Sequence, residues 1–194
     1  DGATWIAWEA YDTTRVWTLL AGDGPKTVYV QYRDALANAS GSFSDGIALD
    51  ATGPTGTLSI NGGAAYTNTT AVTLTLAASD AGSSVAQMRF SNDGSIWSPW
   101  EPYAAGKAWS IPAGDGTVMV YAQFNDLNGN LSTNATDTIL LDTQPPSSSA
   151  TSPAQVAGLS FTVSWSGSDT LSGIASYDVQ YRVGAAGMWT DWLT

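Results

Sequence analysis

Histidine and cysteine are both absent from this chain of 194 residues. Their absence excludes the Ser-His-Asp and Cys-His systems of nucleophilic catalysis, and it removes the usual nitrogen and sulfur ligands of zinc and copper. No disulfide can form, so cysteine usage gives no information about the redox compartment. The sequence therefore predicts a protein that is not an enzyme and that has no cofactor.

Positive charge is also scarce, because six Lys and Arg residues stand against 17 Asp and Glu residues, giving a net charge of -11. An acidic surface repels phosphate backbones, so we expect no nucleic-acid partner. The apolar runs are much shorter than the about 20 residues of a membrane-spanning helix, so we expect no membrane span in this segment. The recurrent aspartates fall at turns and strand ends, where they are expected to accept backbone hydrogen bonds rather than to act as catalytic pairs.

What the chain does contain is an internal repeat. Residues 1–50 align without a gap to residues 93–142, a period of 92 residues with 21 identical positions. Trp189 and Trp192 then lie one further period beyond Trp97 and Trp100. Self-similarity at a fixed period indicates a tandem array of one small domain. We expect residues 1–50 to be the C-terminal half of one repeat, 51–142 a complete repeat, and 143–194 the N-terminal half of the next.

Alternating apolar residues and closely spaced turn signals indicate β-strands throughout the complete repeat. Seven strands are expected. In chain order they contain Leu58 and Ile60; residues 72–77; Ala86, Met88 and Phe90; residues 97–103; Trp109 and Ile111; residues 118–124; and Ile139 and Leu141. Seven short strands in about ninety residues are typical of an antiparallel β-sandwich. The expected fold class is all-β, with one complete and two partial seven-stranded sandwiches joined by short connectors that favour a semi-rigid rod.

Two sets of residues carry a family resemblance. The segment 177–182, followed by Trp189 and preceded by Trp165, resembles a fibronectin type III domain. The segments 24–34 and 126–130 resemble Ig-like repeats that occur in tandem in large bacterial and archaeal cell-surface proteins. The resemblance covers the whole chain. It implies an Ig-like or fibronectin type III-like sandwich and an extracellular, cell-surface location, whereas it says little about a ligand.

One loop has the oxygen-ligand spacing of a calcium site. Asp126, Asn128 and Asn130 stand at positions one, three and five, and Asp137 stands at position twelve. Leu131 replaces the glycine needed at position six, and a hairpin loop is not flanked by helices, so a plain turn is the stronger interpretation. A calcium site of different geometry at a domain junction, with Asp50 or Asp142 as a ligand, is a separate possibility.

The Trp-x-x-Trp-Glu motif is the strongest side-chain signal. Residues three apart on a strand point to opposite faces, so one tryptophan of each pair should be partly exposed, unless the strand breaks at Pro99. Exposed tryptophans can stack on sugar rings or contact a neighbouring chain, although packing alone is the simpler explanation. The candidate contact residues are Trp5, Trp8, Trp97, Trp100, Trp189 and Trp192, whereas Trp17, Trp109 and Trp165 are expected in the core.

Four Asn-x-Ser/Thr sequons are possible N-glycosylation sites, although a chain rich in Asn, Ser and Thr produces such motifs by chance. Their asparagines are Asn38, Asn68, Asn130 and Asn134.

Two functions remain in view. The first is a structural segment of a long extracellular repeat protein (a surface stalk, adhesin or filament subunit) whose partners are neighbouring repeats or neighbouring copies. The second is an accessory carbohydrate-binding or spacer module of a secreted polysaccharide-degrading enzyme, suggested by the tryptophan motif. Half a sandwich rarely buries enough apolar surface to fold alone, so we expect other strands to complete each half, from the continuing chain or from another copy.

Overall fold

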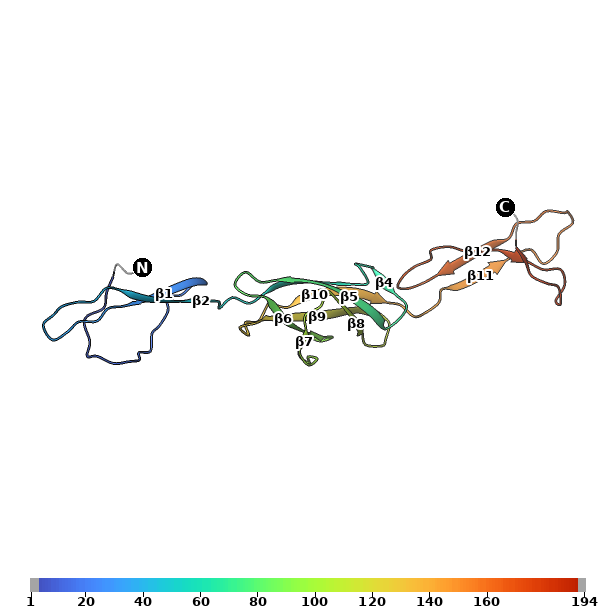
Figure 1. Ribbon diagram of the computed structural model, residues 1–194. Helices are drawn as coiled ribbons and strands as arrows, with labels where there is room; N and C mark the ends of the chain where they lie inside the picture. The colour runs from blue at the N-terminus through green and yellow to red at the C-terminus, as the bar shows by residue number, and fades with distance from the viewer. Residues whose placement is uncertain (1–3, 192–194) are drawn as a thin grey trace.

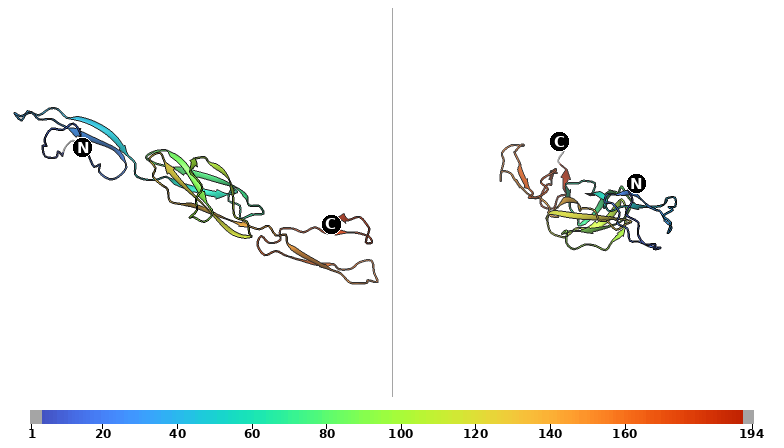
Figure 2. Two further views of the ribbon diagram at one scale, coloured as in Figure 1. Left: turned by 90° about the horizontal axis from the view of Figure 1, so that it is seen from below. Right: turned by 90° about the vertical axis from the view of Figure 1, so that its left-hand side faces the viewer.

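The computed structural model describes residues 4–191, and these residues form strands and loops without any helix. No helix capable of spanning a membrane is found in this range. Figure 1 shows three bodies in a row along the chain, and Figure 2 shows the same end-to-end arrangement from a second direction. Each sheet takes its strands from only one of the three predicted segments.

The middle body contains two sheets. The first has the order β3-β5-β8 and consists of β3 (Thr55–Ile60), β5 (Ala71–Ser79) and β8 (Gly106–Ser110). The second has the order β4-β10-β9-β6-β7 and consists of β4 (Tyr66–Thr67), β10 (Ala135–Leu141), β9 (Gly116–Asp126), β6 (Val85–Ser91) and β7 (Glu101–Pro102). All pairings are antiparallel except that of β4 with β10.

Strict alternation along the strands produces the core between these sheets. In β5, Val72, Leu74 and Leu76 are buried, whereas the intervening threonines are exposed. In β9 the residues that face inward are Val120, Ala122 and Phe124. Because successive side chains on a strand point to opposite faces, each of these strands contributes one apolar face to a shared interior.

The arrangement has Ig-like topology, with β3, β5 and β8 in one sheet, and β6, β9 and β10 in the other. The apolar positions expected to alternate in the main strands lie in strands or beside them, with Ile111 directly after β8. The segment 97–103 differs, because only Glu101–Pro102 pairs. The short strand β4 was not expected from the sequence; it has only two residues and no alternation to reveal it.

The two outer bodies are less covered. The first pairs β1 (Gly24–Val30) with β2 (Phe43–Leu49), and the third pairs β11 (Ser147–Thr151) with β12 (Ser164–Ser168). A further pair joins β13 (Gln180–Tyr181) to β14 (Thr190–Asp191).

The expected positions in these outer bodies need correction. By analogy with the complete repeat, strands are expected over 161–165 and 177–181; the observed strands begin only at Ser164 and cover only Gln180–Tyr181. Trp17 and Trp165, expected in the core, are 47% and 49% exposed. The physical reason is that the strands that would cover them in a complete sandwich are absent from these bodies.

Candidate site at the junction between two repeats

The loop after β9 is organised by one aspartate. Asp126 Oδ1 accepts hydrogen bonds from the backbone N–H groups of Asn128 (2.9 Å) and Asn130 (2.8 Å), and Oδ2 accepts one from Asn130 Nδ2 (2.8 Å). Asp126 is only 2% exposed. Burial raises the pKa of its carboxyl, but the hydrogen bonds from Asn130 and the backbone outweigh that effect and hold the pKa below 3.8.

The same turn occurs one period earlier. Asp34 Oδ1 accepts hydrogen bonds from Leu36 N (2.9 Å) and Asn38 N (2.8 Å), and Oδ2 accepts one from Asn38 Nδ2 (2.9 Å). The side-chain hydrogen bond from Asn38 lowers the pKa of Asp34. Ala37 has φ 70° where Gly129 has φ 85°, so this turn keeps its left-handed residue even where glycine is lost.

In the complete repeat this loop also holds the end of the preceding body. Asn128 Nδ2 donates to Asp50 Oδ2 (2.8 Å), and Asn130 Nδ2 donates to the backbone carbonyl of Asp50 (3.1 Å). Gly53, in the connector, lies so close to the loop that a Cβ atom there would collide with the Leu131 carbonyl oxygen. The connector is therefore fixed against the body that follows it.

An aspartate of the preceding body holds each connector from its other side. Asp23 Oδ1 accepts a hydrogen bond from Ala51 N (2.8 Å), and one period later Asp115 Oδ1 accepts hydrogen bonds from Thr143 N (2.9 Å) and Thr143 Oγ1 (2.7 Å). The pKa of Asp23 is lowered, first by the side chain of Thr52, and that of Asp115 is lowered by the side chain of Thr143. Recurrence at both junctions makes this contact part of the repeat.

Three carboxylates converge at the first junction. Asp50, Asp80 and Asp126 each offer one carboxylate oxygen, and these oxygens lie within 4.8 Å of one another. Asp80 is held by a tight turn, since its Oδ1 accepts hydrogen bonds from Gly82 N (2.9 Å) and Ser83 N (2.8 Å). This turn packs directly on Asp50, because a Cβ atom on Gly82 would be 2.6 Å from Asp50 Oδ1.

The second junction has a partial counterpart. Asp142 is 7% exposed, and its Oδ2 accepts a hydrogen bond from Ser172 N (2.9 Å). Asp169 organises a turn of the same hydrogen-bond pattern as Asp126, with Oδ1 accepting hydrogen bonds from Leu171 N (3.0 Å) and Gly173 N (2.8 Å). The side chain of Ser172 is the main cause of a lowered pKa at Asp142, and the Asp169 side chain adds to it.

Of the four residues proposed from the linear calcium pattern, Asp126, Asn128 and Asn130 share one turn, but Asp137 lies apart from them. Asp137 lies on β10, where Oδ2 accepts a hydrogen bond from Ile60 N (2.8 Å), and it pairs in register with Val120, six residues before Asp126 along β9. That separation is roughly 20 Å along the strand. Asp126 instead meets carboxylates from two other parts of the chain, which no local spacing could indicate.

The tryptophan motif of the complete repeat surrounds one arginine. The Arg89 guanidinium lies 4.7 Å from the Trp97 ring centroid and 4.5 Å from that of Trp100, and its Nε donates to Gln123 Oε1 (2.9 Å). No strand runs between the two tryptophans, so they are free to face the same side chain, and both are half-buried. Because residues 97–100 form no strand, the rule that residues three apart point to opposite faces does not apply to this pair.

Two further tryptophans of the motif also contact arginines. Trp8 lies under Arg33 at 4.6 Å, and Trp189 lies under Arg182 at 4.6 Å. Among the candidates in the outer bodies, the exposed fractions are 43% for Trp5, 47% for Trp8 and 61% for Trp189. Trp192 lies outside the described residues.

The four sequon asparagines differ in environment. Asn38 and Asn130 use their Nδ2 groups in the turns described above, and a glycan on that nitrogen would displace these hydrogen bonds. Asn68 and Asn134 are exposed. Asn68 and Asn134 are therefore the positions at which a glycan would not disturb these turns.

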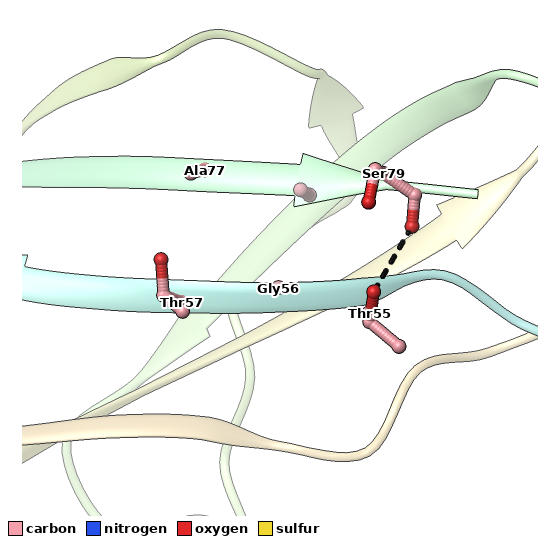
Figure 3. A pocket seen from close by; sticks show the side chains of 6 residues that line it. Thr55, Gly56, Thr57, Ala77 and Ser79 are labelled. Carbon is pink, nitrogen blue, oxygen red and sulfur yellow. Dashed lines mark hydrogen bonds between the residues drawn. The ribbon is translucent and has the colours of Figure 1, made fainter.

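A shallow hollow on the outer face of β3 and β5 carries no acid, base or strong nucleophile; it is lined by Thr55, Gly56, Thr57, Ala77, Ala78 and Ser79. Figure 3 shows the two strands side by side, with Thr55 Oγ1 donating to the carbonyl of Ser79 (3.4 Å). Small hydroxyl and methyl groups alone offer no means of acid-base catalysis.

No protein-family model and no curated protein sequence matches this chain. Among solved structures, the chain is similar to the PKD1 domain of Vibrio anguillarum Epp. The TM-score is 0.37 and the sequence identity is 15%, over 49% of this chain and 100% of the other.

Proposed function

We propose that this chain is a structural segment of a long extracellular repeat protein, a surface stalk, adhesin or filament subunit that acts by rigid extension. The observation that carries the proposal is the connector at Asp50. Asn128 and Asn130 of the following body bind both its side chain and its backbone, and Asp23 binds the next residue from the preceding body. A connector that is hydrogen-bonded to both neighbouring bodies would fix the orientation of one body relative to the next.

The recurrence of these contacts supports the same function. The Asp115 contact with Thr143 repeats that of Asp23 with Ala51 at an interval of one period, so every copy of the repeat would join the next in the same way. Repetition of one junction is what an extended array needs, because a constant rotation per repeat yields a regular rod. We further propose seven main strands for each complete repeat, and no catalytic activity.

The alternative, an accessory carbohydrate-binding module, is less favoured by the aromatic residues. Sugar binding by stacking requires a free aromatic face. In the complete repeat, Trp97 and Trp100 both use a ring face on Arg89. Their contact with an internal partner supports packing as their function.

The native polypeptide and its location test the proposal. Antibodies raised against the chain are expected to label the surface of intact cells. Denaturing gels of native material are expected to show a polypeptide of much greater mass than 20.1 kDa. A single band near 20.1 kDa from an intact assembly would instead favour completion of the half-sandwiches by strand exchange between copies. Detection only in the medium, fused to a catalytic domain, would favour the accessory module.

A further inference from the structure

We propose that the junction between the first and second bodies binds a calcium ion through the carboxylates of Asp50, Asp80 and Asp126. These residues come from the end of one body, from the turn between β5 and β6, and from the end of β9. A cation bound to all three would join the two bodies directly. The binding itself is argued from geometry, whereas its effect on rod stiffness rests on the function proposed above.

The spacing of the oxygens fits one ion. Protein oxygens bind Ca²⁺ at about 2.3–2.6 Å, so two oxygens on the same ion lie no more than about 5 Å apart. The three carboxylate oxygens at this junction lie within 4.8 Å of one another. They therefore already surround a point that a single ion can occupy, without rearrangement of the backbone.

An unsatisfied atom gives independent support. Asp50 Oδ1 is buried and accepts no hydrogen bond, whereas Oδ2 of the same carboxylate is bound by Asn128. Gly82 closes over this side chain, and any larger residue there would collide with Oδ1. A buried charged oxygen without a partner costs free energy that a bound cation would recover.

The charge balance leads to the same conclusion. Three carboxylates at this distance repel one another unless a positive group lies among them. In residues 4–191 the only side-chain ion pairs are Arg15 with Glu9 and Lys107 with Glu101, and neither involves these aspartates. No basic side chain therefore neutralises the cluster in the described part of the chain.

The ligand chemistry selects calcium. All available donors are oxygens, which hard cations prefer, and the absence of histidine and cysteine disfavours zinc and copper. Ca²⁺ tolerates irregular sets of six to eight oxygens, whereas Mg²⁺ requires near-ideal octahedral geometry and retains several waters. Carboxylates gathered from three separate segments suit the more tolerant ion.

Calorimetric titration of the full 194-residue chain with CaCl2, after treatment with a chelator, tests the site. We expect one main binding event with a Kd on the order of 10⁻⁴–10⁻³ M, the range of extracellular calcium modules. Asp50→Asn and Asp80→Asn should each weaken binding at least about tenfold, because each removes one ligand charge. Asp45→Asn makes the same change in net charge on the exposed face of β2 and should leave the affinity unchanged.

Thermal unfolding of the same proteins provides a second measurement. Calcium should raise the Tm of the wild-type and Asp45→Asn chains, but it should raise the Tm of the two site variants much less. Absence of binding in about 10 mM CaCl2, equal affinity for Mg²⁺, or undiminished binding by both site variants would overturn the proposal. None of these results depends on whether the native protein is a surface stalk, so the two proposals can fail separately.

Discussion

At the scale of single residues, aspartate is the residue that organises this molecule. Six aspartates have a lowered pKa, and each accepts hydrogen bonds at a turn or a connector; they are Asp23, Asp34, Asp93, Asp115, Asp126 and Asp142. Because the folded chain donates hydrogen bonds to the deprotonated carboxylates, protonation of these aspartates should weaken the turns and the junctions together.

Asp93 gives the clearest pH dependence. Hydrogen bonds from the backbone N–H groups of Ile96 (2.7 Å) and Ser95 (2.8 Å) lower its pKa from 3.8 to about 2. A depressed pKa contributes stability that is present above about pH 4 and is lost as the pH falls toward 2. In Asp93→Asn the Tm should fall less steeply between pH 4 and pH 2 than in the wild type. Parallel curves would show that this carboxylate does not contribute.

Trp109 tests the packing at the edge of the core. Its ring lies 5.4 Å from that of Phe90, and its Nε1 donates to Asn92 Oδ1 (2.8 Å). Because the ring is half-buried, Trp109→Ala should cost about 2–3 kcal/mol, less than the roughly 3–5 kcal/mol for a fully buried tryptophan. Trp109→Phe keeps the packing and loses the hydrogen bond, so it should cost about 1 kcal/mol. Urea denaturation measures both, and an unchanged midpoint for the alanine variant would place this side chain outside the packed region.

At the scale of strands and loops, alternation determined what could be read from the sequence. The buried positions of β5 and β9 follow from it directly, because a half-buried strand alternates with period two. The strand β4 could not be predicted, since it depends on its contact with β10. The sequence allowed an interruption at Pro99, but it did not indicate that Trp97 and Trp100 both contact Arg89. The carboxylate cluster was hidden for the same reason, because Asp50, Asp80 and Asp126 are distant in sequence.

The segment around the Trp-x-x-Trp motif depends on its arginine. Arg89→Ala should release Trp97 and Trp100 from their shared contact, at a cost of about 1–2 kcal/mol for two cation–π contacts. Quenching of tryptophan fluorescence by acrylamide should increase in this variant. Arg89→Lys retains the charge without the planar group, so an intermediate increase is expected. Equal quenching in all three proteins would contradict a stacking role for Arg89.

The position of the connector should depend on the absence of a side chain at Gly53. A Cβ atom there would collide with the Leu131 carbonyl oxygen, so Gly53→Ala should displace the connector from the loop at a cost of about 1–3 kcal/mol. Hydrogen exchange should accelerate at the backbone amide of Asn130. Gly41→Ala introduces the same methyl group where nothing lies within 4 Å, and it should change neither stability nor exchange.

At the scale of the whole molecule, three bodies follow one another along the chain, and hydrogen bonds hold the connectors between them. The contact of Asp23 with Ala51 recurs one period later as the contact of Asp115 with Thr143, so these junction residues belong to the repeated sequence unit. In the rod proposed above, each further copy would be joined by the same contacts, so its direction would be set locally at each junction.

The stiffness of the first junction is the central claim. The chain has no cysteine, so spin labels can be placed singly on introduced cysteines at Thr27 in β1 and Thr73 in β5. A second labelled pair, at Thr27 and Ala48, reports through dipolar broadening whether the first hairpin is formed.

Pulsed dipolar spectroscopy of the pair at Thr27 and Thr73 should give one narrow distance distribution. Asn130→Ala, which removes the hydrogen bond to the Asp50 carbonyl, should broaden it while the hairpin signal stays unchanged. A broad distribution in the wild-type chain, with the hairpin formed, would contradict a rigid junction and the structural role proposed for the protein.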